Sequence, residues 1–135
     1  MELKNIYLDK VSDLEKFSDE RGSIVDVFYK KNINHVNIVE SKPLVVRGNH
    51  MHRLTVQHVL ILDGSLTYWY QEKDNLKPSF IELNKGDLVT SPPGEIHAMK
   101  IGPSGCTFMA FSEGPRGGED YESDTFRVNS IIENE

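Results

Sequence analysis

Short apolar runs separated by turn residues constrain the fold of this chain more than any other feature of its sequence. Rich in β-branched and aromatic residues, they alternate with Gly, Pro, Asn and Asp and comprise Ile24 to Tyr29, Val36 to Val39, Leu44 to Val46, Val56 to Leu62, Leu66 to Tyr70, Phe80 to Leu83, Leu88 to Val89 and Thr107 to Phe111. Short strands at this spacing are typical of an antiparallel sandwich or barrel. The sequence therefore predicts an all-β fold, and its 135 residues suffice for one domain over 1–135. Only the segment VSDLEKFSDE, residues 11–20, is compatible with a helical turn.

The segment LDGS, residues 62–65, predicts where two of these runs turn into each other. Asp-Gly between two alternating apolar runs is a strong signal for a two-residue hairpin loop. In that register Val59 pairs with Tyr68, and paired residues share a face. One face would then line the barrel interior and would consist of Gln57, Val59, Ile61, Leu66, Tyr68 and Tyr70. The polar groups of this face would lie toward one end of the barrel. The alternation places His58 on the outer face, against Trp69.

Charge and cysteine content exclude several classes of function. The net charge of −6 and the pI near 5.3 argue against a nucleic-acid surface, because phosphate binding needs clustered Lys and Arg. No apolar run approaches the roughly 20 residues of a membrane span, and the start MELKNIYLDK lacks the apolar segment of a signal peptide. The single cysteine, Cys106, excludes an intrachain disulfide and a cysteine-based zinc cluster. We therefore expect a cytoplasmic protein, with the terminal IIENE as a loosely held tail.

Two separate segments carry the candidate functional histidines. His50 and His52 are two residues apart, so on an extended segment their rings emerge on one side and can reach a common point. In the second segment, GDLVTSPPGEIHAM, a rigid Pro-Pro-Gly corner precedes His97 and fixes its direction. From the residues alone the three imidazoles remain open to three interpretations: metal ligands, an acid/base set, or buried histidines that only hydrogen-bond to one another.

Together these segments resemble the two motifs of the cupin superfamily, G-x5-H-x-H-x3-4-E-x6-G and G-x5-P-x-G-x2-H-x3-N. His50, His52, Gln57 and Gly64 fit the later places of the first motif, and Gly86, Pro92, Gly94 and His97 fit the second, while Ile101 stands where the family has Asn. The resemblance covers most of the chain. It implies a double-stranded β-helix, the antiparallel cupin jelly-roll barrel, and a homodimer.

The departures from the first motif point to one branch of the superfamily. Gln57 replaces the metal-binding glutamate, so a divalent metal becomes possible rather than expected. The segment RGNHMH, beginning at Arg47, resembles the metal-independent dTDP-4-dehydrorhamnose 3,5-epimerases and, more closely, the dTDP-sugar 3,4-ketoisomerases. The segment FSDERGSIVDVFY resembles the early D-x-R-G stretch of the epimerases, which implies that Arg21 contacts the diphosphate of a dTDP-sugar; a charged turn is the alternative. The loop around Arg116 is predicted to cover the barrel mouth or to be solvated.

The chemistry of a 4-keto sugar assigns roles to these residues. The carbonyl acidifies the neighbouring C–H bonds, so a base with a pKa near neutrality can remove a proton, and histidine meets that requirement. The expected catalytic residues are His50 as the base, His52 as its orienting partner or proton shuttle, and Tyr70 or Tyr68 as the acid; the expected substrate ligands are Arg21, Arg47, Gln57 and His97. If the protein is such a sugar isomerase, we expect no cofactor. Two alternatives stay open: a metal-binding cupin, such as an oxygenase, with His50, His52, Gln57 and His97 as ligands, and a sugar-binding cupin without catalysis.

Overall fold

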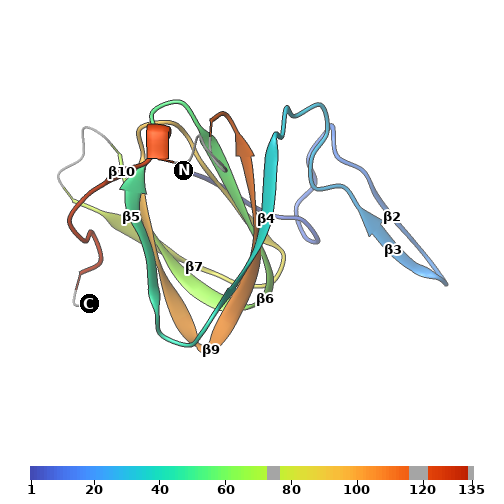
Figure 1. The fold of residues 1–135 in the computed structure, drawn as a ribbon. Coiled ribbons are helices and arrows are strands. Elements are labelled where there is room, and N and C mark those ends of the chain that lie inside the picture. The colour runs from blue at the N-terminus through green and yellow to red at the C-terminus, as the bar shows by residue number, and fades with distance from the viewer. Residues whose placement is uncertain (73–76, 116–121, 134–135) are drawn as a thin grey trace.

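The structure, a computed structural model, describes residues 1–72, 77–115 and 122–133 as an antiparallel barrel with a projecting hairpin (Figure 1). The strands are β1 (Glu2–Asn5), β2 (Lys16–Asp19), β3 (Gly22–Val25), β4 (His35–Ser41), β5 (Val46–Met51), β6 (Val56–Gln71), β7 (Ser79–Leu83), β8 (Asp87–Ser91), β9 (Ile96–Glu113) and β10 (Phe126–Arg127). A single 3-10 turn, η2 (Glu122–Asp124), is the one helical element among the described residues. The all-β antiparallel prediction is confirmed.

Two long strands, β6 and β9, run antiparallel along their whole length and build both walls of the barrel. The first half of β6 also pairs with β8, and its second half with β7. Strand β9 pairs with β5 through its first half and with β4 through its second half. Each wall therefore contains one half of both long strands.

The predicted hairpin at Asp63 and Gly64 is wrong, because β6 is continuous and its two halves pair with β9 rather than with each other. The turn signal instead marks the corner where the chain passes from one wall to the other. Gly64 has φ +79°, and a Cβ at this position would collide with the carbonyl oxygen of Gly105. Glycine is required here because the two strands cross in close contact.

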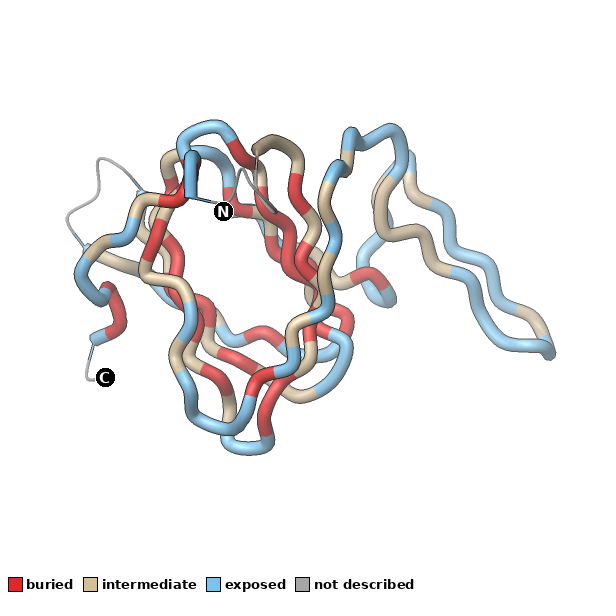
Figure 2. Tube along the Cα trace, in the orientation of Figure 1, coloured by how far each residue is buried: buried red, intermediate tan, exposed pale blue. Residues whose placement is uncertain are grey.

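The predicted division of β6 into two faces is confirmed, although the pairing behind it was not. Of the residues assigned to the interior, Val59, Ile61, Leu66 and Tyr68 belong to the inner core, Tyr70 packs against it, and Gln57 is buried beside it. The other members of this core are Leu83, Val89, Met99, Ile101, Cys106, Phe108 and Ala110. In Figure 2 the buried positions lie mostly on the strands of the barrel, and the first half of β6 is buried on both faces. Alternation within each half of β6 determines its faces, whichever strand lies beside it.

The outer face differs from the prediction in its contacts. The His58 ring lies on this face as predicted, but it packs edge-on against Phe28, at 4.8 Å between ring centroids, and not against Trp69. Trp69 instead packs with Ile131 and Ile132, each 8% exposed. The terminal segment is therefore not a loose tail up to residue 133, since two of its apolar side chains cover the barrel.

Residues 11–20 form no helix: one turn, in which the backbone N–H of Leu14 donates to the carbonyl oxygen of Val11, precedes β2. Strand β2 pairs with β3 as an isolated two-stranded sheet. This hairpin extends away from the barrel (Figure 1). Its apolar Phe17 and Ile24 pair across the strands and are largely exposed. No helix in the described part of the chain is long and apolar enough for a membrane crossing.

Candidate active site

Strand register gathers the predicted histidines at one end of the barrel. Tyr70 on β6 pairs with His97 on β9, and His97 pairs with His50 on β5. Since cross-strand partners share a face, these three side chains form a polar row directed into the barrel. The next inward positions on β6 and β9 are Tyr68 and Met99, which belong to the apolar core. The row therefore lies where the core ends.

A second polar row lies on the other wall. From β4 to β8 it consists of His35, Ser112, Gln57 and Ser91, joined by successive cross-strand pairs. The neighbouring row toward the core is mostly apolar, with Ala110, Val59 and Val89. The two rows form a polar mouth over a hydrophobic base, as predicted for the interior face of β6.

A bulge in β5 sets the direction of His50. The register with β9 shifts between Gly48 and His50, so that Asn49 is the extra residue. Gly48 and Asn49 have φ +89° and +57°, and a Cβ on Gly48 would lie 2.8 Å from the carbonyl oxygen of His97. The bulge breaks the alternation and brings Arg47 and His50 to one face, where both line a cavity of about 140 Å³.

The Pro-Pro-Gly corner holds His97 against the first histidine segment. Gly94 has φ +86° and donates its backbone N–H to the carbonyl oxygen of His52, at 2.6 Å. Two residues later β9 begins at Ile96, and the next residue is His97, which is 1% exposed. The corner therefore joins the two motifs by a backbone hydrogen bond.

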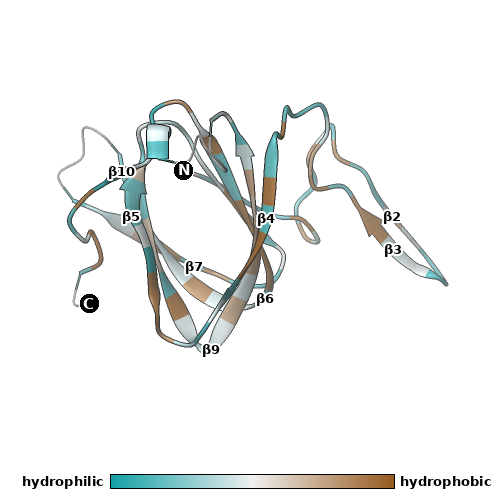
Figure 3. Ribbon diagram, in the orientation of Figure 1, coloured by the Kyte–Doolittle hydropathy of each residue, from teal (hydrophilic) through white to brown (hydrophobic). Residues whose placement is uncertain are grey.

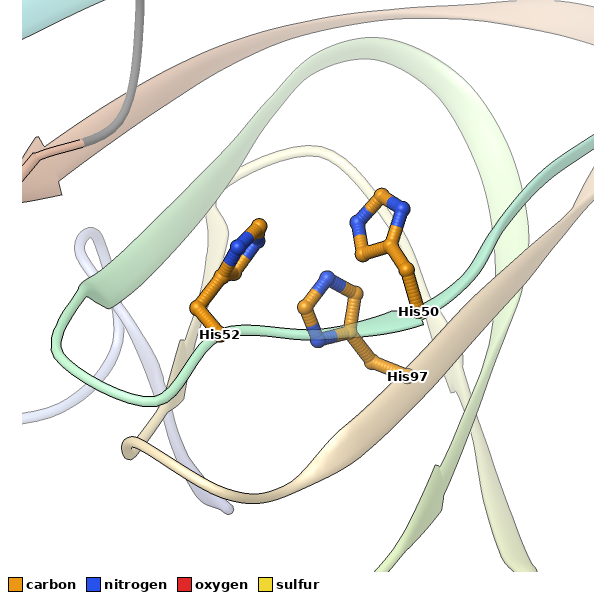
Figure 4. A group of neighbouring side chains, drawn as sticks. All are labelled: His50, His52 and His97. Atoms are coloured by element: carbon orange, nitrogen blue, oxygen red, sulfur yellow. The ribbon is translucent and has the colours of Figure 1, made fainter. Parts of the chain in front are cut away.

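The three histidine rings form a compact cluster (Figure 4). Ring centroids are separated by 5.0 Å between His50 and His52, 4.7 Å between His50 and His97, and 5.5 Å between His52 and His97. The His50 and His97 rings meet edge to face, at 87°. All three are buried, so each imidazole acts in a medium that strengthens its interactions with a neighbouring charge.

His52 is held at both ring nitrogens. Its Nδ1 lies 2.8 Å from the carbonyl oxygen of Asp124, which can only accept, so Nδ1 carries a proton. Its Nε2 lies 3.1 Å from Oε1 of Gln57. With this amide orientation Nε2 also donates and His52 is an imidazolium; with the amide reversed, Gln57 donates to a neutral ring. In both cases His52 is poorly placed as a base, because each nitrogen already has a partner.

Asp124 was missed by the sequence analysis and anchors this segment. Its buried carboxylate accepts hydrogen bonds from the backbone N–H groups of Arg53, Leu54 and Thr55 and from the Thr55 hydroxyl. Burial favours the neutral acid, but these hydrogen bonds outweigh it and hold the pKa of Asp124 below its usual range. An aspartate in an acidic terminal segment carries no local sequence signal for this long-range role.

The two predicted tyrosines differ in their surroundings. Tyr68 is 1% exposed, shares a short hydrogen bond with the Ser91 hydroxyl and lies nearly parallel to the His97 ring, with 6.2 Å between centroids. Burial raises the pKa of Tyr68 well above its ordinary value, so its proton is hard to release. Tyr70 is only partly buried and stands beside His97 in the polar row, which favours it as the acid.

The predicted arginines lie in different places. The guanidinium of Arg47 is bound to β4, where Nε donates to the Ser41 hydroxyl at 2.7 Å. Arg21 lies at the tip of the β2–β3 hairpin, with its side chain 81% exposed and paired with Asp19. Within one chain the structure does not bring Arg21 to the histidine cluster. Arg116 lies outside the described residues.

The three imidazoles could hold a metal ion, but not with His52 bound as it is. The ligand atoms of His50, His52 and His97 lie within 4.8 Å of one another, and the cluster contains no carboxylate among the described residues. Three histidines are a donor set that zinc accepts, with Zn–N bonds of about 2.0–2.1 Å. Since His52 also uses both nitrogens for protein contacts, an ion would have to displace Gln57.

Comparison with solved structures identifies proteins with this fold. The QdtA 3,4-ketoisomerase from Thermoanaerobacterium thermosaccharolyticum in complex with TDP has 19% sequence identity and a TM-score of 0.71, over 94% of this chain and 87% of that chain. A 3,4-ketoisomerase from Helicobacter canadensis has 19% identity and a TM-score of 0.72, over 95% and 92%. The dTDP-4-dehydrorhamnose 3,5-epimerase from Sulfolobus tokodaii has 19% identity and a TM-score of 0.67, over 87% and 78%. No family model and no curated protein matches the sequence. The chain therefore has the jelly-roll fold of these enzymes.

Proposed function

We propose that this chain is a nucleotide-sugar isomerase, which epimerises or ketoisomerises a 4-keto-deoxysugar nucleotide by histidine acid/base enolisation. The observation that carries the proposal is the buried pair of His50 and His97 at the polar mouth of the barrel. A role in deoxysugar or polysaccharide synthesis and a cytoplasmic location are parts of the same proposal.

The residues around the pair fit the steps of an enolisation. His50 is the base and removes the proton beside the ketone, since it faces the cavity with Arg47 and Gln57. The enolate that forms needs hydrogen-bond donors or positive charge nearby, and His52 supplies positive charge in its imidazolium form, while both of its N–H groups stay bound to Asp124 and Gln57. Tyr70 lies in the same row and can return a proton to the sugar from the side of His50.

The cavity size limits which part of the substrate enters. Its volume of about 140 Å³ is below the range of roughly 300–1,000 Å³ for typical ligand pockets. We infer that the sugar ring enters the barrel while the nucleoside diphosphate stays outside its mouth. The ketoisomerase and epimerase structures support the substrate class, because QdtA was solved with TDP and with TDP-4-keto-6-deoxyglucose.

The test uses TDP-4-keto-6-deoxyglucose as the substrate and NMR to identify the product. We expect the wild type to convert it and the His50→Gln variant to lose at least a hundredfold in kcat. A 3-keto product would assign the protein as a ketoisomerase, and inversion at C3 or C5 as an epimerase. Binding of TDP without conversion of the sugar would replace the proposal by a sugar-binding role.

A metal-dependent reaction is the alternative that the histidine cluster raises. Elemental analysis of protein purified without chelator, together with conversion measured after EDTA treatment, separates the two. We expect conversion to survive chelation. One metal per chain, with activity lost on chelation and regained on adding that metal, would refute the metal-free proposal.

We also propose a homodimer, in which the β2–β3 hairpin of one subunit covers the other. The hairpin presents Phe17 and Ile24, 56% and 67% exposed, and β4 presents Val36 and Ile38, 50% and 62% exposed. Figure 3 shows hydrophobic segments on both β3 and β4. Burying each large apolar side chain contributes about 1.5–3 kcal/mol, which favours association. Only in such a dimer could Arg21 serve a substrate diphosphate, at the partner's site.

Light scattering after size-exclusion chromatography tests the dimer. The wild type should have twice the chain mass of 15.4 kDa, and the Phe17→Asp/Ile24→Asp double variant should be a monomer. As a matched control, Leu8→Asp changes an exposed apolar residue outside the hairpin and should remain dimeric. A monomeric wild type at micromolar concentration would contradict the proposal.

A further inference from the structure

The inward face of β4 carries His35, a histidine without a role in the reaction proposed above. His35, Asn37 and Val39 are less exposed than the alternate residues of β4. The register pairs His35 with Ser112, which is 0% exposed. Nδ1 of His35 and the hydroxyl oxygen of Ser112 are both buried without a hydrogen-bond partner in the described part of the chain. Burying a polar group without a hydrogen-bond partner is costly, so a ligand that satisfies these two groups gains affinity.

His35 lies across the mouth from the histidine cluster. In its row, Ser112 stands between His35 and Gln57, so two strand spacings, roughly 10 Å, separate the backbones of His35 and Gln57. Gln57 in turn contacts His52. Asn37, the next inward residue of β4, lines the same cavity as His50. His35 on β4 and His50 on β5 therefore belong to opposite walls of the polar mouth.

The start of β4 is held firmly in place. The side-chain amide of Asn34 donates to the carbonyl oxygen of Gly114 at 2.7 Å and accepts from the N–H of Gly114 at 3.2 Å. The backbone N–H of Asn34 donates to the carbonyl oxygen of Ser112 at 3.0 Å. Three hydrogen bonds thus fix the residue before His35 to the end of β9, which gives His35 a defined position.

We propose that His35 is a second catalytic residue, which delivers a proton to the enolate from the side opposite His50. This inference rests on the proposed function and deepens it. A base that removes a proton from one side of a sugar ring cannot also protonate its opposite side. Imidazole is suited to the task because it exchanges protons near neutral pH.

The proton balance of the step is complete. His50 takes the proton of the C–H bond beside the ketone, and the electron pair of that bond forms the C=C bond of the enolate, leaving the negative charge on the ketone oxygen. In epimerisation His35, as an imidazolium, gives its proton to the opposite face of the carbon, and exchange with solvent restores His50 and His35. In ketoisomerisation His35 gives its proton to the ketone oxygen; the other hydroxyl of the enediol then returns a proton to His35 as it becomes the new ketone, while C4 takes a proton from Tyr70 on the side of His50. Exchange with solvent then restores His50 and Tyr70.

The test separates proton removal from proton delivery. Wild type, His35→Gln and His35→Asn are incubated with TDP-4-keto-6-deoxyglucose in D₂O, and deuterium in the recovered substrate is compared with product formed. We expect both variants to lose at least a hundredfold in kcat with KM within threefold, while deuterium exchange falls much less. The matched control is His58→Gln, since His58 lies outside the barrel, bound to Thr90 and Glu113; it should keep wild-type kcat.

Each outcome has a distinct meaning. An increase of tenfold or more in the ratio of exchange to product in both His35 variants supports the inference. Equal loss of exchange and product indicates a structural role and overturns it, as does an unchanged kcat. A wild type that neither exchanges nor converts the substrate refutes the proposed function and this inference with it.

Discussion

Replacing Gly48 by alanine tests the bulge that directs His50. Gly48 has φ +89°, a conformation that costs an L-residue about 1–2 kcal/mol. The new Cβ would also lie 2.8 Å from the carbonyl oxygen of His97 and 3.0 Å from Cα of Ala98. Both contacts are backbone atoms, which yield only if β5 and β9 move apart, and overpacking of this kind costs about 1–3 kcal/mol. We therefore expect Gly48→Ala to lower the free energy of unfolding by about 2–5 kcal/mol.

The same displacement should impair the reaction, because it moves His50 relative to His97. A misplacement of about 1 Å can reduce a rate by about a hundredfold. Urea titration gives the free energy of unfolding, and conversion of TDP-4-keto-6-deoxyglucose gives kcat. Gly22→Ala is the matched control, since Gly22 has φ +132° with no atom within 4 Å of the added Cβ. If both variants lose the same stability and Gly48→Ala keeps wild-type kcat, the argument from close strand contact fails.

Three further variants test the surroundings of the site. Asp124→Asn should lower the free energy of unfolding by about 2–4 kcal/mol at pH 7. Because the pKa of Asp124 is lowered in the folded state, the stabilisation by its carboxylate is present above about pH 4 and is lost as the pH falls through the folded-state pKa. The free energies of unfolding of variant and wild type, measured by urea titration, should therefore converge in acid. Equal free energies of unfolding at pH 7 would refute the role of Asp124 as an anchor of this segment. Tyr68→Phe should keep kcat within tenfold, whereas Tyr70→Phe should lose about a hundredfold; the reverse order in steady-state kinetics would move the acid to Tyr68. Ile132→Ala should cost about 2–4 kcal/mol in the same titrations, and no loss would mean that the terminal segment does not contribute to the core.

Local sequence patterns predicted the strands and faces well because they depend on neighbouring residues. Alternation along β6 placed Tyr68 inside and His58 outside. The strand pairing was wrong, because an Asp-Gly turn looks the same at a hairpin loop and at a barrel corner. Only contact with Gly105, far along the chain, distinguishes the two.

The candidate site was predicted where motif residues carry it and missed where distant segments complete it. The spacing of His50, His52 and His97 allowed their convergence to be expected. The carbonyl oxygen of Asp124 reaches His52 across 72 residues of sequence, and His35 enters through its pairing with Ser112. These contacts depend on register over long sequence separations, for which a single sequence has no local signal.

The most direct test of the account is deuterium incorporation into TDP-4-keto-6-deoxyglucose by chelator-treated protein in D₂O. The wild type should incorporate deuterium at a carbon beside the ketone without added metal, and His50→Gln should not. Incorporation by His50→Gln at the wild-type rate, or none by the wild type until a divalent metal is restored, would contradict histidine acid/base catalysis in this barrel.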